Sequence, residues 1–296
     1  MNGKRIATIA AYAGFGFVAT VIFVYMTFPL EAVQGRVARA LEQAVPGLKV
    51  SFGAASPYRL SGLDVEDLKL TYEKTPGQPP VVATIDRVRA RVQILPLISK
   101  NYAVSYHVNL GDGSVSGEVH SGATAVGLEL QMKDVDLAHP PVLAKLLGMD
   151  LGGIIDADID VTINDDPKKT NGHVQFDMKK ARIGEANVMG FTVPPIDLGT
   201  TSATLEIKDG VMAFKKFEQK SADLEAKITG DVTLRKQVPA SNLNLAVQFK
   251  LTDAFLANNP KFKTIVQISG IERTKNPSGF YNAKVTGALS SPIPSL

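Results

Sequence analysis

The sequence predicts a mainly β protein: a single N-terminal transmembrane helix followed by an extended, twisted, mostly antiparallel β-sheet with a few short helices. Three observations lead to this prediction. Residues 6–30 form an uncharged, apolar run. From residue 48 onward, apolar residues recur at every second position, which is the period of a strand with one buried face. Clusters of Gly, Asp and Pro separate these alternating segments, as is typical of turns between antiparallel strands.

The apolar run has the length of a membrane anchor. A helix over residues 6–30 would be about 37 Å long, which exceeds a hydrocarbon core of about 30 Å. The run is longer than the core of a signal peptide, and no clear cleavage pattern follows it. Lys4 and Arg5 precede it, so we expect residues 1–5 to stay in the cytoplasm. We therefore predict a single-pass protein of the inner membrane, with the bulk of the chain in the periplasm.

A short amphipathic helix is predicted directly after the anchor, within residues 31–47. Its apolar residues recur at four-residue spacing: Val33, Val37, Leu41 and Val45. Pro46 and Gly47 end the pattern. This helix could pack on the end of the sheet or lie on the membrane surface, and its narrow apolar stripe favours packing on the sheet.

Residues 48–296 are predicted to form one β-rich domain, with strands at the segments of period two. The alternating segments are residues 68–72, 88–94, 104–110, 115–119, 126–132, 155–163, 174–178, 203–207, 211 onward, 224–234, 243–251, 265–268 and 281–289. Short helices are expected at 140–147 and 253–258, residues 281–289 are expected to form the last strand, and Pro292 and Pro294 follow at the end of the sequence. The order of strand, short helix and strand occurs in 128–163 and again in 245–289, which predicts a weak internal repeat.

Composition excludes several classes of function. The net charge of +3 is small, and no block of Lys and Arg occurs, so nucleic acid is not an expected partner. The absence of cysteine excludes thiolate catalysis and cysteine-based metal sites. The sequence contains no P-loop, no dinucleotide fingerprint and no nucleophile elbow. We therefore expect a non-enzymatic protein without a cofactor.

Two groups of residues in the sequence are potential metal ligands, three aspartates and four histidines. Asp156, Asp158 and Asp160 resemble the first half of a calcium loop, but Val161 and Pro167 occupy the positions where such a loop needs Gly and Glu. Because strand residues two apart share a face, we expect a solvated row of carboxylates.

The histidines are also expected to be ordinary surface residues. His107, His120, His139 and His173 lack the spacing of metal ligands. His107 and His120 could face each other across the turn at residues 111–113, but two residues do not make a metal site.

Arg87, Arg89 and Arg91 are predicted to line one face of a strand. Such a row commonly forms a charged solvent face that discourages pairing between sheet edges. Alternatively, it could bind an anionic partner, either lipid headgroups or an acidic protein surface.

The longest clean alternation forms an apolar face near the C-terminus. Its members are Leu243, Leu245, Val247, Phe249 and Leu251. The face could be a closed core or an open groove for lipid. We expect a closed core near this strand, because the predicted helix at 253–258 is close enough in sequence to cover it.

Several segments together resemble the N protein family of the type II secretion system. The pair Phe28 and Pro29 closes the anchor, residues 41–47 end a short helix, and Tyr58 to Val65 lead into the sheet. Residues 85–96 and 111–117 fit the same family. The resemblance implies a non-catalytic accessory component, anchored in the inner membrane, that contacts other type II secretion proteins.

The same features are similar to the wider AsmA-like group of envelope proteins. Members of that group use long β-sheets as grooves for lipid, so this alternative implies phospholipid as a ligand. Neither resemblance supplies catalytic residues.

Overall fold

The structure is a computed structural model that describes residues 30–44, 47–59, 61–73, 80–99, 101–122, 124–138, 150–188, 191–268 and 270–295. The predicted anchor lies outside these residues except for Leu30, and so does the predicted helix at 140–147. Among the described residues, no helix has both the length and the apolar character needed to cross a membrane. The anchor therefore stays a prediction.

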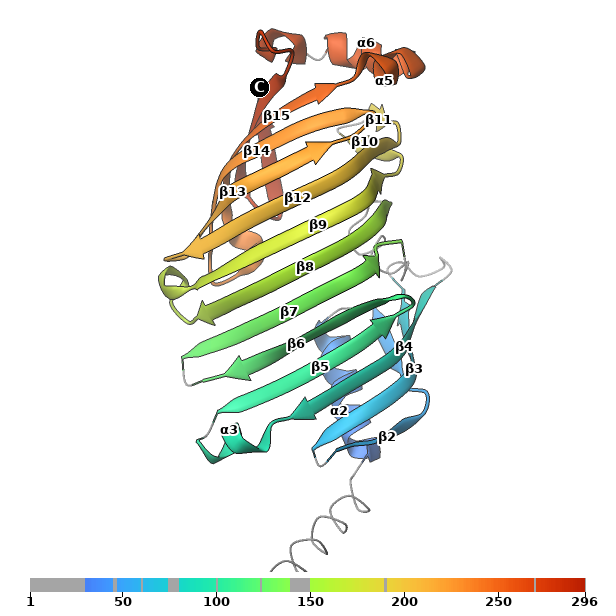
Figure 1. The fold of residues 1–296 in the computed structure, drawn as a ribbon, viewed down its shortest axis with the longest axis vertical. Helices are drawn as coiled ribbons and strands as arrows, with labels where there is room; N and C mark the ends of the chain where they lie inside the picture. Colours follow the sequence, from blue (N-terminus) through green and yellow to red (C-terminus); the bar gives the residue numbers. More distant parts are fainter. Residues whose placement is uncertain are drawn as a thin grey trace, which may run out of the picture.

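One sheet of fifteen strands makes up most of the described chain (Figure 1). Neighbouring strands follow the chain almost in order, because each turn returns the chain beside the strand it has just left. All pairs are antiparallel. The strands are β1 (Leu48–Ser51), β2 (Ala55–Tyr58), β3 (Gly62–Tyr72), β4 (Val81–Val92), β5 (Tyr102–Leu110), β6 (Gly113–Ser121), β7 (Ala125–Asp136), β8 (Leu151–Asn164), β9 (Asn171–Ile183), β12 (Ile196–Lys208), β13 (Val211–Lys220), β14 (Leu224–Thr233), β15 (Asn242–Leu251), β16 (Tyr281–Ala288) and β17 (Ser291–Ser295). The predicted mainly β, antiparallel fold is thus confirmed.

The remaining elements are short and lie at the ends and sides of the sheet. A separate hairpin, β10 (Ala186–Val188) and β11 (Phe191–Val193), is inserted between β9 and β12. The helices are α2 (Leu30–Ala44), α3 (Ile94–Ile98), α5 (Asp253–Asn258), α6 (Pro260–Ile268), η1 (Pro167–Lys169), η2 (Val238–Ala240) and η3 (Ile271–Thr274). Helices α2 and α5 confirm two of the predicted helices.

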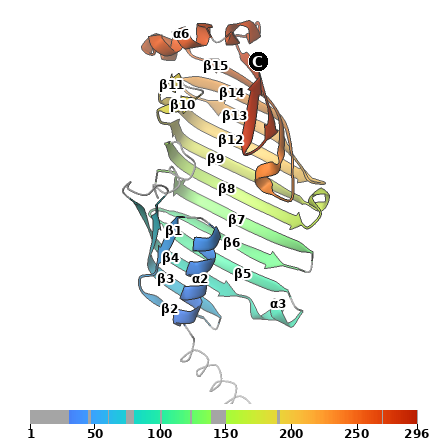
Figure 2. The ribbon, with the colours of Figure 1, turned by 180° about the vertical axis from the view of Figure 1, so that it is seen from behind.

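The sheet curls so that both of its ends turn toward the same side. Helix α2 and strands β16 and β17 lie behind the sheet in Figure 1 and in front of it in Figure 2. One-residue register shifts interrupt the pairs β7–β8, β8–β9, β9–β12, β12–β13 and β13–β14. Such bulges increase local twist and bend a strand. They account for a curved sheet with a concave face, which we call the trough, and a convex face.

Helix α2 closes one end of the trough. The carboxylate of Glu42 accepts a hydrogen bond from the backbone N–H of Val50 in β1, at 3.1 Å. This bond ties the helix to the first strand of the sheet. The described residues of the helix contact β1 and β2, whereas Val37 and Leu41 of its apolar stripe stay 40% and 38% exposed.

A compact core closes the other end. Leu251, Phe255, Val266 and Tyr281 are buried together, and Phe249 packs against them. Thr252 caps helix α5, because its hydroxyl accepts a hydrogen bond from the N–H of Phe255 at 3.2 Å. This core is built from β15, α5, α6 and β16, and it covers only the end of the sheet.

Three local predictions are corrected. Residues 265–268 belong to helix α6, not to a strand. Pro260 starts that helix. Phe262 and Val266, which are four residues apart, both pack in the core, so the short apolar run at 265–268 forms part of a helix and not a strand. Strand β4 ends at Val92, and α3 takes up residues 94–98. Residues 281–289 do not form the last strand, because the edge strand β17 follows them and contains Pro292 and Pro294.

Candidate functional site: the trough

The trough presents one continuous apolar surface across the sheet. The register places residues of successive strands opposite one another, so that they form rows perpendicular to the strands. One row runs from β3 to β12 through Leu63, Ala90, Tyr106, Gly117, Leu130, Ile159, Val174 and Leu205. A second row contains Val119, Leu128, Val161, Gly172, Ile207, Met212, Val232 and Leu243. The apolar side chains therefore all reach the same face.

Burial along these rows is uneven. In β12, Leu205 retains only 5% of its exposure, and Ala203 and Ile207 are buried as well. In the middle strands β5 to β9, by contrast, Tyr106, Leu130, Ile159 and their neighbours in the first row stay partly exposed. A closed two-layer core would bury these residues as fully as Leu205. Among the described residues, no helix or second sheet layer covers the middle of the trough.

The predicted apolar face of β15 shows the same gradient within one strand. Leu243 and Leu251 are buried, whereas Leu245, Val247 and Phe249 between them are partly exposed. Phe249 contacts Tyr281, with ring centroids 5.4 Å apart. The structure thus places the Leu251 end of this face in the closed core, whereas Leu245 and Val247 lie in a more open surface.

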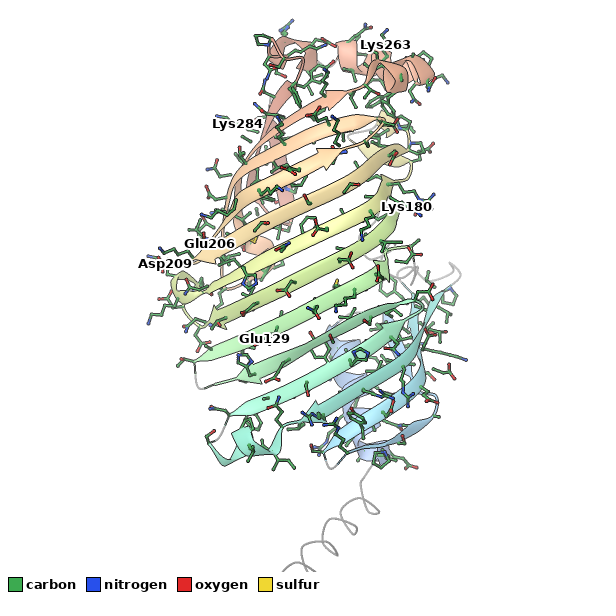
Figure 3. The ribbon with its side chains drawn as sticks, viewed as in Figure 1. Glu129, Lys180, Glu206, Asp209, Lys263 and Lys284 are labelled. Carbon is green, nitrogen blue, oxygen red and sulfur yellow. The ribbon has the colours of Figure 1, made fainter. Side chains whose placement is uncertain are left out.

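The convex face is polar throughout. Its strands carry Glu129, Asp158, Gln175, Glu206 and Lys227, among others, and Figure 3 shows such side chains spread across this face. The alternation of apolar and polar residues along each strand separates the two faces. The trough therefore offers a ligand with an apolar body a complementary surface that the polar residues of the convex face do not.

The arginine row lies on the convex face, and its charge is partly neutralised by the neighbouring strand of the same sheet. Arg87 binds Asp64 of β3 through two hydrogen bonds of 2.8 Å, and Arg89 reaches the same carboxylate at 3.0 Å. Arg91 donates to the hydroxyl of Ser105 at 3.2 Å. Arg87 also forms an ion pair with Glu66 of β3 at 3.3 Å, so two of the three arginines already have anionic partners on the neighbouring strand.

Asp64 itself is almost fully buried, with 8% exposure. The hydrogen bond from Arg87 lowers the pKa of the Asp64 carboxyl, and the bond from Arg89 acts in the same direction, although burial opposes both. The carboxylate is therefore charged near neutral pH and fixes both arginines. This geometry favours a structural role for Arg87 and Arg89.

The aspartate row in β8 behaves as a polar surface. Asp156 accepts the backbone N–H of Asp134 at 2.9 Å and the ammonium of Lys179 at 3.2 Å, and these two contacts lower the pKa of its carboxyl. Asp158 contacts His173 at 3.2 Å. No group of three or more potential ligands in the described part of the chain is arranged to hold a metal ion.

The two histidines of the β5–β6 hairpin do not face each other. The turn pairs Leu110 with Gly113, and this register places His107 opposite Ser116. His120 is paired with Ala103 instead. The expectation was wrong because a two-residue turn sets the register of the whole hairpin. His139 lies outside the described residues.

A cleft at one long side of the trough was not predicted from the sequence. It has a volume of about 540 Å³ and lies where β7 begins and where β8, β12 and β14 end. Val161 and Ile207 contribute to its lining, as do Arg235 and Lys236. No local pattern marks it, because its residues are up to about a hundred positions apart in the chain.

Both open edges of the sheet carry proline. The outermost strand β17 contains Pro292 and Pro294, and the short edge strand β2 contains Pro57. Proline has no N–H, so Ser291, Ile293 and Ser295 are left to donate toward β16, and the prolines occupy the outward positions. A further strand would find few donors along β17, whereas β1, which shares the other edge with β2, contains no proline.

Comparison of the chain with family models, curated proteins and solved structures finds no match.

Proposed function

We propose that this chain is a non-catalytic protein of the bacterial envelope whose trough binds the acyl chains of phospholipid beside the inner membrane. One observation carries the proposal: the first apolar row crosses the middle strands without being fully buried. Exposed apolar surface is costly in water, and large contiguous patches usually serve for binding. An acyl chain satisfies such a surface without needing specific polar partners.

The shape of the trough supports an extended ligand. Its rows continue from strand to strand over β3 to β12 without a charged residue in the first row. A compact ligand would instead need a pocket with a few convergent polar groups. The predicted anchor at residues 6–30 directly precedes α2, so it would hold the trough next to the source of lipid.

A second candidate is an accessory role in type II secretion through protein–protein contacts. Three of the segments that carry the resemblance form one region of the described structure. They contribute β2 with β3, β4 with α3, and the β5–β6 turn. This shared region, at the end of the sheet beside α2, favours a common docking role. The proline-bearing edges argue that such docking uses side-chain surfaces and not strand addition.

The test is native mass spectrometry of the full chain extracted in mild detergent. We expect phospholipid to co-purify with the wild-type protein. Ile159→Asp places a charge in the middle of the trough, where the side chain is partly exposed, so the protein should fold but lose its lipid. The matched control is Thr162→Asp, an exposed position on the convex face of the same strand, which should keep the lipid.

The two candidates give different results. Wild-type protein that carries a secretion component but no phospholipid would contradict the lipid proposal and support the second candidate. Equal loss of lipid in both variants would show that the trough is not where the lipid binds.

A further inference from the structure

The cleft beside the trough has a wall that hydrogen bonds hold in place, whereas the two apolar rows form an open surface. The segment that follows β14 forms one of its walls, through Leu234, Arg235, Lys236 and Val238. Two hydrogen bonds hold this segment: Leu234 donates to the carbonyl of Gly210 at 2.8 Å, and the N–H of Arg235 donates to the hydroxyl of Ser241 at 3.1 Å. Ser241 is fully buried. The wall is therefore positioned by the fold before any ligand arrives.

The interior of the cleft is apolar. Val161 and Ile207 lie in its floor and are buried. At the lip, Val126, Ile163 and Val238 expose 39%, 47% and 58% of their surface. These residues continue the apolar surface of the trough into the cleft.

Two cations stand beside this apolar interior. Arg235 and Lys236 both line the cleft, and among the described residues neither of them forms an ion pair. Asp165 is the one carboxylate in the lining. The cleft thus combines apolar walls with an excess of positive charge, whereas the first row of the trough carries no charge.

We propose that this cleft is the headgroup end of the lipid site, and that it selects anionic phospholipid. Arg235 and Lys236 contact the phosphate, and an acyl chain lies on Val161, Ile163 and Ile207 and continues into the trough. This inference rests on the proposed function. A free phosphate ion would gain nothing from the apolar walls, and a neutral lipid would gain less from the two cations.

The experiment measures lipid binding by the full chain, purified in a maltoside detergent and stripped of lipid. The probes are phosphatidylglycerol and phosphatidylcholine with the same fluorescent acyl chain. Arg235→Glu together with Lys236→Glu should weaken binding of phosphatidylglycerol by at least about tenfold and change phosphatidylcholine little. The matched control is Lys261→Glu with Lys263→Glu on the exposed face of α6, which makes the same change in net charge far from the cleft (Figure 3).

A variant at the apolar lip of the cleft distinguishes the contribution of the apolar surface from that of the two cations. Val126→Asp replaces a partly exposed side chain at the lip, so it should leave the fold intact and weaken both lipids alike. Thermal unfolding of every variant verifies that the proteins are folded.

Each outcome decides between the proposals. Wild-type binding of both lipids with no change in the Arg235 and Lys236 variant overturns the headgroup site and leaves the trough proposal standing. A wild-type protein that binds neither lipid overturns both. Displacement of phosphatidylglycerol by inorganic phosphate would identify a phosphate site and overturn the assignment to lipid.

Discussion

A matched pair of leucine truncations measures whether the trough is open. Leu205 and Leu130 lie in the same row on the concave face, but Leu205 is buried and Leu130 is partly exposed. Leu205→Ala removes side-chain atoms from a buried position and leaves a cavity, which should cost about 3 kcal/mol of the free energy of unfolding. Leu130→Ala removes atoms that already contact water and leaves no enclosed cavity, so its cost should be about 1 kcal/mol.

The expected difference is large enough to measure. For a chain of this size, about 1 kcal/mol corresponds to a shift of about 2–4 °C in the unfolding temperature. Leu205→Ala should therefore lower that temperature by about 6–12 °C and Leu130→Ala by about 2–4 °C. The assay is thermal unfolding of the full chain, followed by circular dichroism in one detergent. If both variants lose the same stability, the middle of the trough is a closed core and the reasoning behind the lipid site fails.

Two further predictions concern buried polar contacts. Asp64→Asn removes the charge that holds Arg87 and Arg89, and because both arginines are partly exposed, we expect a loss of about 2 kcal/mol at neutral pH. Because folding lowers the pKa of Asp64, the ion pairs stabilise the fold fully above the ordinary pKa of an aspartate, and this stabilisation is lost as the pH falls through the pKa of Asp64 in the folded state. The Asp64→Asn variant should therefore lose less stability in acid than the wild type. Equal losses of stability in acid would contradict this. Tyr281→Phe removes a hydrogen bond of 2.8 Å to Glu272 and should cost about 1–2 kcal/mol. Burial and Glu272 raise the pKa of Tyr281 to about 12, so wild-type stability should fall as the pH rises from about 10 toward that value. Denaturant titrations across this pH range should show a smaller alkaline loss in the variant, and an unchanged loss would refute the assignment.

Period-two alternation was sufficient to predict most strands and both faces of the sheet. It works because side chains of a strand alternate between faces regardless of what the strand pairs with. The Asp209–Gly210 turn was equally clear, since both residues have positive φ in the structure, as a tight hairpin turn requires. The alternation within each strand and the turn residues between strands were therefore enough to predict a series of consecutive antiparallel strands.

Short apolar runs were ambiguous for the opposite reason. Residues 265–268 fit either a buried strand or a helix turn, and only packing against the core selected the helix. Likewise, the arginine row was recognised from its spacing, but its partner Asp64 lies 23 residues before Arg87 and is brought there by the β3–β4 register. Pairing between strands is not encoded in the spacing within one strand.

The sequence by itself determined a polar face, an apolar face and the strands that carry them. Only the tertiary structure decided that the sheet curls toward its apolar face, that the two ends are closed while the middle stays partly exposed, and that a cleft forms beside Arg235 and Lys236. The physical reason is that burial depends on curvature and on contacts between distant strand ends. Val126, Ile163, Ile207 and Arg235 meet only after the sheet has formed and bent.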